Sequence, residues 1–227
     1  EAKLKSQRII IWFSAIGILL VLGLAAVIFN GSRKQKLANT LLARQNKQIE
    51  HQKQEITDSI NYAQRIQNAI MPEREEFYSV FPKSFILYQP KDIVSGDFYW
   101  VEEIRGKSLF AAVDCTGHGV PGAFISIVAH NCFDQAFRDK TEKATVADIL
   151  HRASELFNEH IRQTYEDSVV RDGMDVTFCA FDFKNRKMEF AGANHTLVII
   201  RNGERIEYKG DKHSIGIFIG EEIKKFT

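Results

Sequence analysis

The stretch VDCTGHGVPG, residues 113–122, decides the fold of this chain together with SGDFYW, residues 95–100. Each stretch places an aspartate beside glycine at the end of an expected strand, Asp97 before one strand and Asp114 at the close of the next. If the two strands pair as a hairpin through Arg105-Gly106-Lys107, both aspartates lie at nearly equal distances from the turn. We therefore expect the two carboxyl groups to lie almost opposite each other at one end of a sheet.

A pair of carboxylates held this close favours a cation site. The two charges repel each other and raise one pKa unless a cation sits between them. Mg²⁺ and Mn²⁺ prefer oxygen ligands of this kind, and glycines at 96, 117 and 119 would let the backbone approach a hydrated ion or a phosphate closely. From spacing alone the alternative stays open that Asp97 and Asp114 are turn or capping residues.

Other chemistries lack part of their pattern. Residues 117–122 have the glycine spacing of a dinucleotide fingerprint, but the required second parallel strand with its acidic residue is absent. Cys115 and His118 form a C-x-x-H without a partner pair, so structural zinc is not expected. Three widely spaced cysteines do not suggest a disulfide framework. A net charge of +1 gives no basis for nucleic-acid binding, which needs a basic face.

Around these motifs the chain alternates short β-rich runs and amphipathic helices. Between the two groups of strands, helices are predicted over residues 121–137 and 145–163, the second opened by a capping box of Thr145 and Asp148. Strands are predicted over residues 84–89, 98–104, 108–114, 175–182, 187–191, 196–201 and 204–208. Two helices between two groups of antiparallel strands indicate an α+β fold.

The N-terminal part predicts a membrane span. Residues 9–29 carry no charge, and as a helix they would extend about 31 Å, close to the ~30 Å of a bilayer core. Lysines and arginines are more numerous after this segment than before it, which favours a cytoplasmic C-terminal side. Residues 1–8 would then end a sensor region that precedes the span. A signal peptide or a buried soluble helix is the alternative.

Residues 32–71 predict a long helical linker. The run contains neither glycine nor proline and stops at Pro72, which cannot continue a helix. Apolar residues recur with a heptad period at Leu42, Ile49, Ile56, Ala63 and Ile70. This spacing favours a marginal parallel coiled coil, and hence a homodimer through the linker. A solvated linker helix is the alternative.

Four segments carry a resemblance to a known family. DIVSGDFY at 92–99, the run at 113–123, YAQRIQNAIMP at 62–72 and AGANH at 191–195 resemble the SpoIIE-type branch of the metal-dependent serine/threonine phosphatases (PPM, or type 2C). The resemblance implies an α-β-β-α sandwich over residues 77–227 with two Mg²⁺ or Mn²⁺ ions at one end. Asp114 matches the residue that bridges both ions, Asp97 a second ligand, and the carbonyl of Cys115 a backbone ligand.

The resemblance also implies a function. The parent protein would be a bacterial signalling phosphatase, anchored by one span in the inner membrane, that hydrolyses phosphoserine or phosphothreonine through a two-metal-activated water. Its expected substrate is a phosphorylated regulatory protein, such as an antagonist of an anti-sigma factor. The family's later T-D-G and D-D motifs do not occur here, and His195 departs from its usual turn. We therefore expect a C-terminally truncated domain that can be inactive alone, and a non-catalytic phosphatase-like binding module is the alternative.

Overall fold

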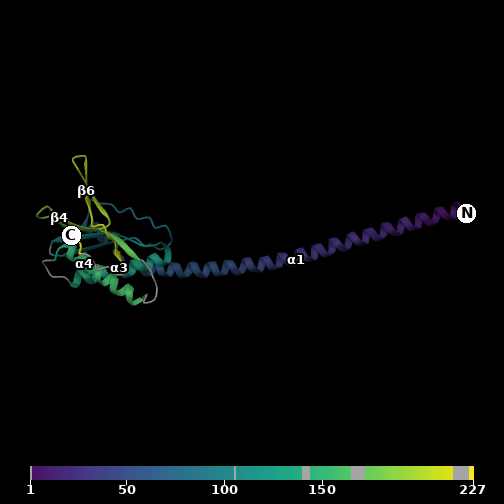
Figure 1. Cartoon of the computed structure of the whole chain (residues 1–227), viewed down its shortest axis with the longest axis horizontal. Helices are drawn as coiled ribbons and strands as arrows, with labels where there is room; N and C mark the ends of the chain where they lie inside the picture. Colours follow the sequence, from purple (N-terminus) through teal and green to yellow (C-terminus); the bar gives the residue numbers. More distant parts are fainter. Residues whose placement is uncertain (1, 105, 140–143, 165–171, 217–224) are drawn as a thin grey trace. The chain divides into compact units, whose positions relative to one another are not determined.

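A computed structural model describes residues 2–104, 106–139, 144–164, 172–216 and 225–227. The chain divides into two compact units, residues 1–57 and 58–227. Helix α1 (Ala2–Ile70) is continuous through the apolar segment and the linker (Figure 1) and ends just before Pro72, as predicted. Among the described helices it is the one long and apolar enough to cross a membrane, with a mean hydropathy of 2.6 in its most apolar window.

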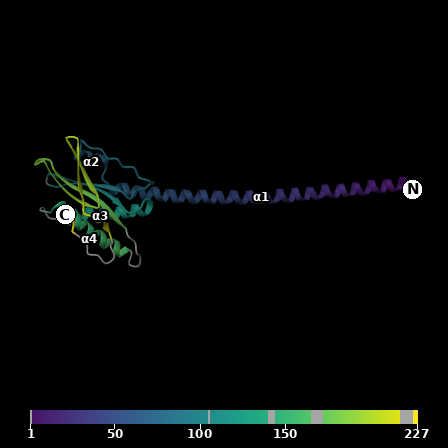
Figure 2. The same ribbon diagram turned by 45° about the horizontal axis from the view of Figure 1, so that its top comes forward.

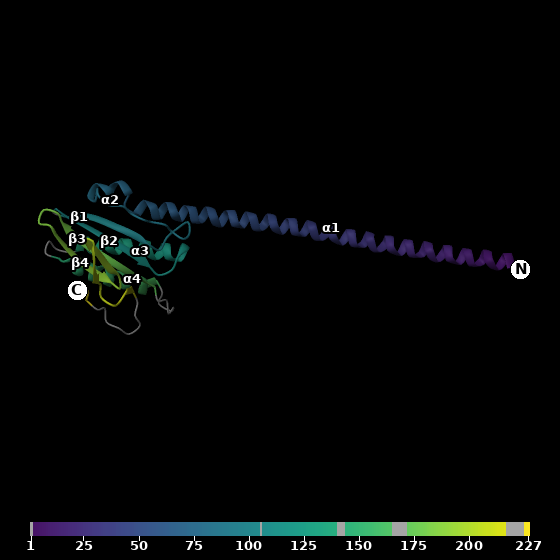
Figure 3. The same ribbon diagram turned by 90° about the horizontal axis from the view of Figure 1, so that it is seen from above.

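The second unit is built around one antiparallel sheet. Its strands β1 to β4 (labelled in Figure 3) follow the order β1-β2-β3-β4. The short β7 pairs with the start of β3, while β5 and β6 form a separate hairpin. The strands are β1 (Phe98–Ile104), β2 (Lys107–Cys115), β3 (Gly173–Asp182), β4 (Lys187–Ala193), β5 (Thr196–Arg201), β6 (Glu204–Lys209) and β7 (Ile215–Gly216). The helices are α2 (Arg74–Val80), α3 (Gly119–Asp139) and α4 (Val146–Thr164).

The predicted hairpin between the two aspartate motifs is present. Strands β1 and β2 pair from Ile104 opposite Lys107 at the turn to Phe98 opposite Val113 at the far end. Gly106 adopts a φ of +80°, which a non-glycine residue rarely tolerates, while Arg105 of the predicted turn lies outside the described residues. The register is therefore set by a tight turn and a long ladder.

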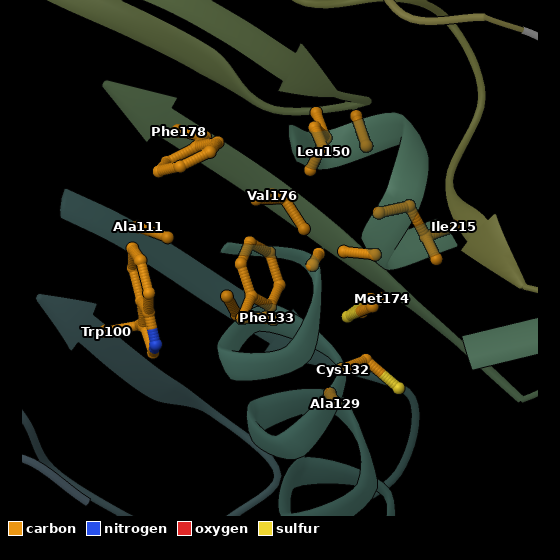
Figure 4. Close-up of a cluster of buried hydrophobic side chains, with 14 of the residues drawn as sticks. Trp100, Ala111, Ala129, Cys132, Phe133, Leu150, Met174, Val176, Phe178 and Ile215 are labelled. Carbon is orange, nitrogen blue, oxygen red and sulfur yellow. The ribbon is translucent and has the colours of Figure 1, made fainter. Parts of the chain in front are cut away.

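Helices α3 and α4 pack side by side (Figure 2) against one face of the sheet. Alternate strand residues face these helices, and Figure 4 shows Phe133 of α3 among Trp100, Val176 and Phe178 of the strands. The predicted capping box at the start of α4 is confirmed, since Thr145 N–H donates to Asp148 Oδ2 and Asp148 N–H to Thr145 Oγ1. The α+β class is confirmed as well.

The opposite face of the sheet carries an element that the sequence did not predict, the short helix α2. The rings of Phe77 and Phe81 lie at edge-to-face angles against Tyr99, Phe110 and Phe181 of the strands. These aromatic side chains alternate with the residues that face α3 and α4. The sheet is therefore apolar on both faces at this end.

The strand predicted over residues 84–89 is wrong. This segment is irregular, and its Phe85 and Leu87 side chains are 85% and 77% exposed. A strand persists only where a neighbour satisfies its backbone hydrogen bonds, and no strand of the described part of the chain pairs with residues 84–89. A composition rich in aromatic and β-branched residues was therefore not sufficient to make residues 84–89 a strand.

A buried histidine makes the fold sensitive to acid. His130 of α3 packs on the Phe98 ring, and its Nδ1 has no hydrogen-bond partner, with Asp134 Oδ2 at 3.9 Å. Burial lowers the pKa of His130 below its ordinary 6.5, and the Asp134 charge opposes this only in part. The unfolded chain therefore binds more protons below pH 6.5 than the folded chain does, and stability is lost as pH falls from 6.5 through the lower native pKa.

We expect His130→Phe, which keeps a ring against Phe98 but cannot titrate, to flatten this part of the pH profile. Unfolding free energies from urea titrations between pH 7.5 and 5 should show a wild-type slope that is steeper by up to about 1.4 kcal/mol per pH unit. The difference between the two proteins isolates His130 from the other histidines. Parallel profiles would contradict the assignment.

Candidate metal centre

The hairpin places Asp97 and Asp114 together. Each aspartate lies one residue beyond the last pair of the β1–β2 ladder, Phe98 opposite Val113. Both carboxyl groups line one cavity on the sheet face opposite α3 and α4, and Asp114 lies close enough to raise the pKa of Asp97. The arrangement expected from the spacing of the two motifs is thus present in the fold.

The electrostatics of the pair are those of two competing carboxylates. Partial burial raises the pKa of Asp97, the negative charge of Asp114 and the hydrogen bond between them raise it further, and His195 opposes these effects. Burial, followed by the charges of both aspartates, also raises the pKa of the Cys115 thiol well above its ordinary value. Two acidic groups held this close favour the binding of a positive ion between them.

Glycines bring the two motifs together by packing backbone against backbone. A Cβ added at Gly96 would lie 2.7 Å from the Gly117 carbonyl oxygen and 3.2 Å from that of Cys115. A Cβ at Gly122 would lie 2.7 Å from the same Gly117 oxygen. Glycines 96, 117 and 119 were expected to let the backbone approach an ion or a phosphate; in the fold, Gly96 and also Gly122 allow the two loops to touch. Gly117 and Gly119 adopt φ values of +89° and +64°.

The C-terminal end of α1 is joined to the Asp97 loop by a buried amide. Gln67 is 3% exposed, and its Nε2 donates to the Ser95 carbonyl oxygen at 2.6 Å and to Ser126 Oγ of α3 at 2.8 Å. The Ser95 N–H donates in return to Gln67 Oε1 at 3.1 Å, and the Asp97 N–H donates to Ser95 Oγ. The linker helix, the loop before β1 and α3 therefore meet at one side chain.

We expect Gln67→Leu, which keeps the volume but not the polar atoms, to lower the free energy of unfolding by about 2–3 kcal/mol. The reason is that the Ser95 amide would stay buried without its partner, and the Ser95 carbonyl would keep only the Ser126 hydroxyl at 3.2 Å. Urea denaturation followed by circular dichroism measures the effect. Asn68→Leu on the exposed side of the same turn is the matched control and should be nearly neutral; equal effects at both positions would contradict this role of Gln67.

Two residues near the pair were not predicted as site residues. Asp175 of β3 lies opposite Asp114 in the ladder and so on the same face of the sheet. Its oxygens accept hydrogen bonds from Asn194 Nδ2 and Ser214 Oγ. His195 follows Asn194 and lines the same cavity as Asp97 and Asp114. Sequence spacing alone could not find these residues, because the proximity depends on the pairing of β2 with β3.

His118 lies outside this cavity lining, at the start of α3. Its Nδ1 is 2.9 Å from Asp92 Oδ2, and its Nε2 is 3.2 Å from Lys91 Nζ. Both ring nitrogens thus contact exposed polar groups of the segment before β1. This contact links the glycine-rich loop to the same segment that Gln67 holds.

The donor set fits part of a site for a hard divalent cation. Carboxylate oxygens of Asp97 and Asp114, with the carbonyl of Cys115 beside Gly96, are oxygen ligands of the type that Mg²⁺ and Mn²⁺ prefer. The structural observation that favours a cation here is the position of two acidic side chains at the same end of the β1–β2 ladder, in the wall of one cavity. Within the described ranges, no group of three or more histidine, cysteine, aspartate or glutamate side chains is arranged to hold a metal ion. The described residues therefore supply only part of a coordination shell.

Fold and site together define an α+β domain with a pair of acidic residues at one end of its sheet. Residues 105–227 match the family model of stage II sporulation protein E, SpoIIE, and the chain belongs to this family. Asp114 lies inside the matched range and Asp97 just before it. Among proteins with curated descriptions, none matches the chain.

Solved structures give the fold. The SiaA-PP2C domain of Pseudomonas aeruginosa is 34% identical, with a TM-score of 0.63 over 72% of this chain and 64% of that one. The PP2C phosphatase domain and regulatory fragment of SpoIIE from Bacillus subtilis is 17% identical, with a TM-score of 0.43 over 59% of this chain and 37% of that one. The chain thus spans less than two thirds of either structure. The type 2C phosphatase-like fold, present in part, is confirmed by the SiaA-PP2C match.

Proposed function

We propose that this chain is part of a protein phosphatase that hydrolyses phosphoserine or phosphothreonine on a partner protein with the help of two Mg²⁺ or Mn²⁺ ions. The observation that carries the proposal is that Asp97 and Asp114 lie together at one end of the β1–β2 ladder and line one cavity, within a SpoIIE-family fold. Similarity to a domain named SiaA-PP2C supports the same class of activity. The partner would be a phosphorylated regulatory protein, of the type that antagonises an anti-sigma factor.

The residues of this chain would hold the ions and keep their ligands in place. Asp97, Asp114 and the Cys115 carbonyl would bind the cations, which supply charge neutralisation on the phosphoryl group and acidify the attacking water. The packing of Gly96, Gly117 and Gly122 would hold the two acidic residues at one end of the sheet. Hydrolysis by water needs no nucleophilic side chain, and the buried Cys115 thiol, with its raised pKa, is poorly suited to that role.

We further propose that the phosphatase is anchored in the bacterial inner membrane by residues 9–29, after the end of a sensor region at residues 1–8. The apolar character of α1 supports a span. Residues 32–71 would form the linker and residues 77–227 the cytoplasmic catalytic portion. The heptad side chains Leu42, Ile49 and Ile56 are exposed on α1, which supports pairing with a second copy.

A non-catalytic binding module is the second candidate function. It is favoured by the small number of acidic ligands in the described residues. The two functions are separated by measuring phosphate release from a phosphoserine protein with the full chain in detergent, with Mn²⁺ or with a chelator. Release that depends on Mn²⁺ supports the phosphatase, whereas binding of the phosphoprotein without release supports the module.

A further inference from the structure

The turn between β4 and β5 carries a basic side chain that the proposed function leaves without a role. His195 lines a cavity of about 690 Å³ together with Asp97 and Asp114, while aromatic side chains form much of the remaining wall. Among the described residues that line this cavity, His195 is the only basic one. A phosphomonoester placed beside the two carboxylates therefore finds one basic side chain among these residues, next to neutral donors such as the Gln89 amide.

The backbone of this turn is held in a fixed position. Asn194 has a φ of +55°, in the left-handed region, and its N–H donates to the Asp211 carbonyl oxygen at 2.7 Å. The N–H of His195 donates to the Ala193 carbonyl oxygen at 2.7 Å, and the His195 carbonyl oxygen accepts from the Gly210 N–H at 3.0 Å. Hydrogen bonds on both sides of the turn thus fix the point from which the His195 side chain starts.

A second contact ties this turn to the strand beside Asp114. Asn194 Nδ2 donates to Asp175 Oδ2 at 2.8 Å, and Asp175 lies opposite Asp114 in the β2–β3 ladder. Ser214 Oγ donates to the other oxygen of Asp175. The carboxylate of Asp175 is therefore engaged in holding two loops, and its place in the ladder sets the position of the turn relative to Asp114.

His195 lies within electrostatic reach of the acidic pair. The positive charge of a protonated His195 lowers the pKa of Asp97, whereas the negative charge of Asp114 raises it. An imidazole also keeps one N–H donor when it is neutral, so its binding of an anion does not require protonation. Hydrogen bonds in which one partner is charged are stronger than those between neutral groups.

We propose that His195 donates its ring N–H to a phosphoryl oxygen of the phosphomonoester that Asp97 and Asp114 bind through their cations, and that Asn194 positions it through Asp175. This inference rests on the proposed function and adds a substrate-contacting residue to it. Binding alone is assigned to His195, and no bond of the substrate is made or broken by it.

The test measures phosphate binding and hydrolysis separately, on the full chain in detergent micelles. Isothermal titration with inorganic phosphate in Mg²⁺ should give a dissociation constant that is about tenfold higher for His195→Ala. His195→Gln, which keeps an N–H donor, should recover most of the affinity, and Asn194→Ala should lose part of it. His51→Ala, on an exposed side chain of α1, is the matched control and should bind phosphate like the wild type.

In kinetics with a phosphoserine protein, KM should rise most for His195→Ala, less for Asn194→Ala and least for His195→Gln. The change in kcat should be smaller than the change in KM. If the alanine variant unfolds, His195→Phe replaces it in the test, because phenylalanine keeps a ring but has no hydrogen-bond donor. Its phosphate affinity should be reduced like that of His195→Ala. Wild-type phosphate affinity in His195→Ala, or no phosphate binding by the wild type, would overturn the inference. Phosphate binding that depends on His195, without any hydrolysis, would instead sustain it and refute the proposed phosphatase activity.

Discussion

Replacement of Asp114 by asparagine should reduce Mn²⁺-dependent phosphate release by at least about 100-fold. The bound cations supply several kcal/mol of transition-state stabilisation, and each 1.4 kcal/mol corresponds to a factor of ten in rate. An amide in place of the carboxylate removes one negative charge from the shared oxygen set at the end of β2. The measurement is phosphate release from a phosphoserine protein by the full chain in detergent, across a range of Mn²⁺ concentrations, under conditions in which the wild type releases phosphate.

The same substitution should leave the fold intact or make it more stable. Asp114 raises the pKa of Asp97, so the two carboxylates destabilise each other when no cation is bound. Loss of activity with an unchanged or higher melting temperature would therefore separate a functional role from a structural one. Asp182→Asn, at the far end of β3 and half-buried, is the matched control and should keep wild-type activity. An Asp114→Asn variant with wild-type release would refute the assigned site.

Replacement of Phe133 by alanine should lower the free energy of unfolding by about 3–5 kcal/mol, which is typical for deletion of a buried aromatic ring. Phe133 is 0% exposed, and its ring contacts those of Phe98 and Trp100 on β1 and of Phe178 on β3. The cavity left behind cannot close easily, because α3 is held against the sheet on both sides of this position. Urea denaturation followed by tryptophan fluorescence measures the loss.

Phe124 offers a matched control on the same helix. Its side chain is 61% exposed, so Phe124→Ala should change the stability by no more than about 0.5 kcal/mol. Since a domain is usually stable by only about 5–15 kcal/mol, the Phe133 variant should also lose activity at elevated temperature. Similar losses for both variants would show that α3 does not pack as described.

Local patterns predicted most of the elements. The strand at 98–104 and the heptad of residues 42–70 depend only on near neighbours. The strand was predicted at its observed ends, and the linker helix at nearly its observed C-terminal end, although it continues unbroken into the apolar segment. Pro72 and the Thr145–Asp148 capping box act within one turn of helix, so their effects could also be predicted. The segment at 84–89 has the composition of a strand, but it depends on a partner strand, which is why this prediction was wrong.

The candidate site likewise has a part that depends on near neighbours in the chain and a part that depends on distant ones. Equal distances from a tight turn were enough to predict that Asp97 and Asp114 meet. In a hairpin, residues at equal distances from the turn lie opposite each other, and both strands belong to one continuous piece of chain. The sequence by itself determined the long helix, the α+β pattern and this acidic pair. The positions of Asp175, His195 and Gln67 beside it were decided only by tertiary structure, because they depend on β2 pairing with β3 and on α1 packing against α3, which bring together residues far apart in the chain.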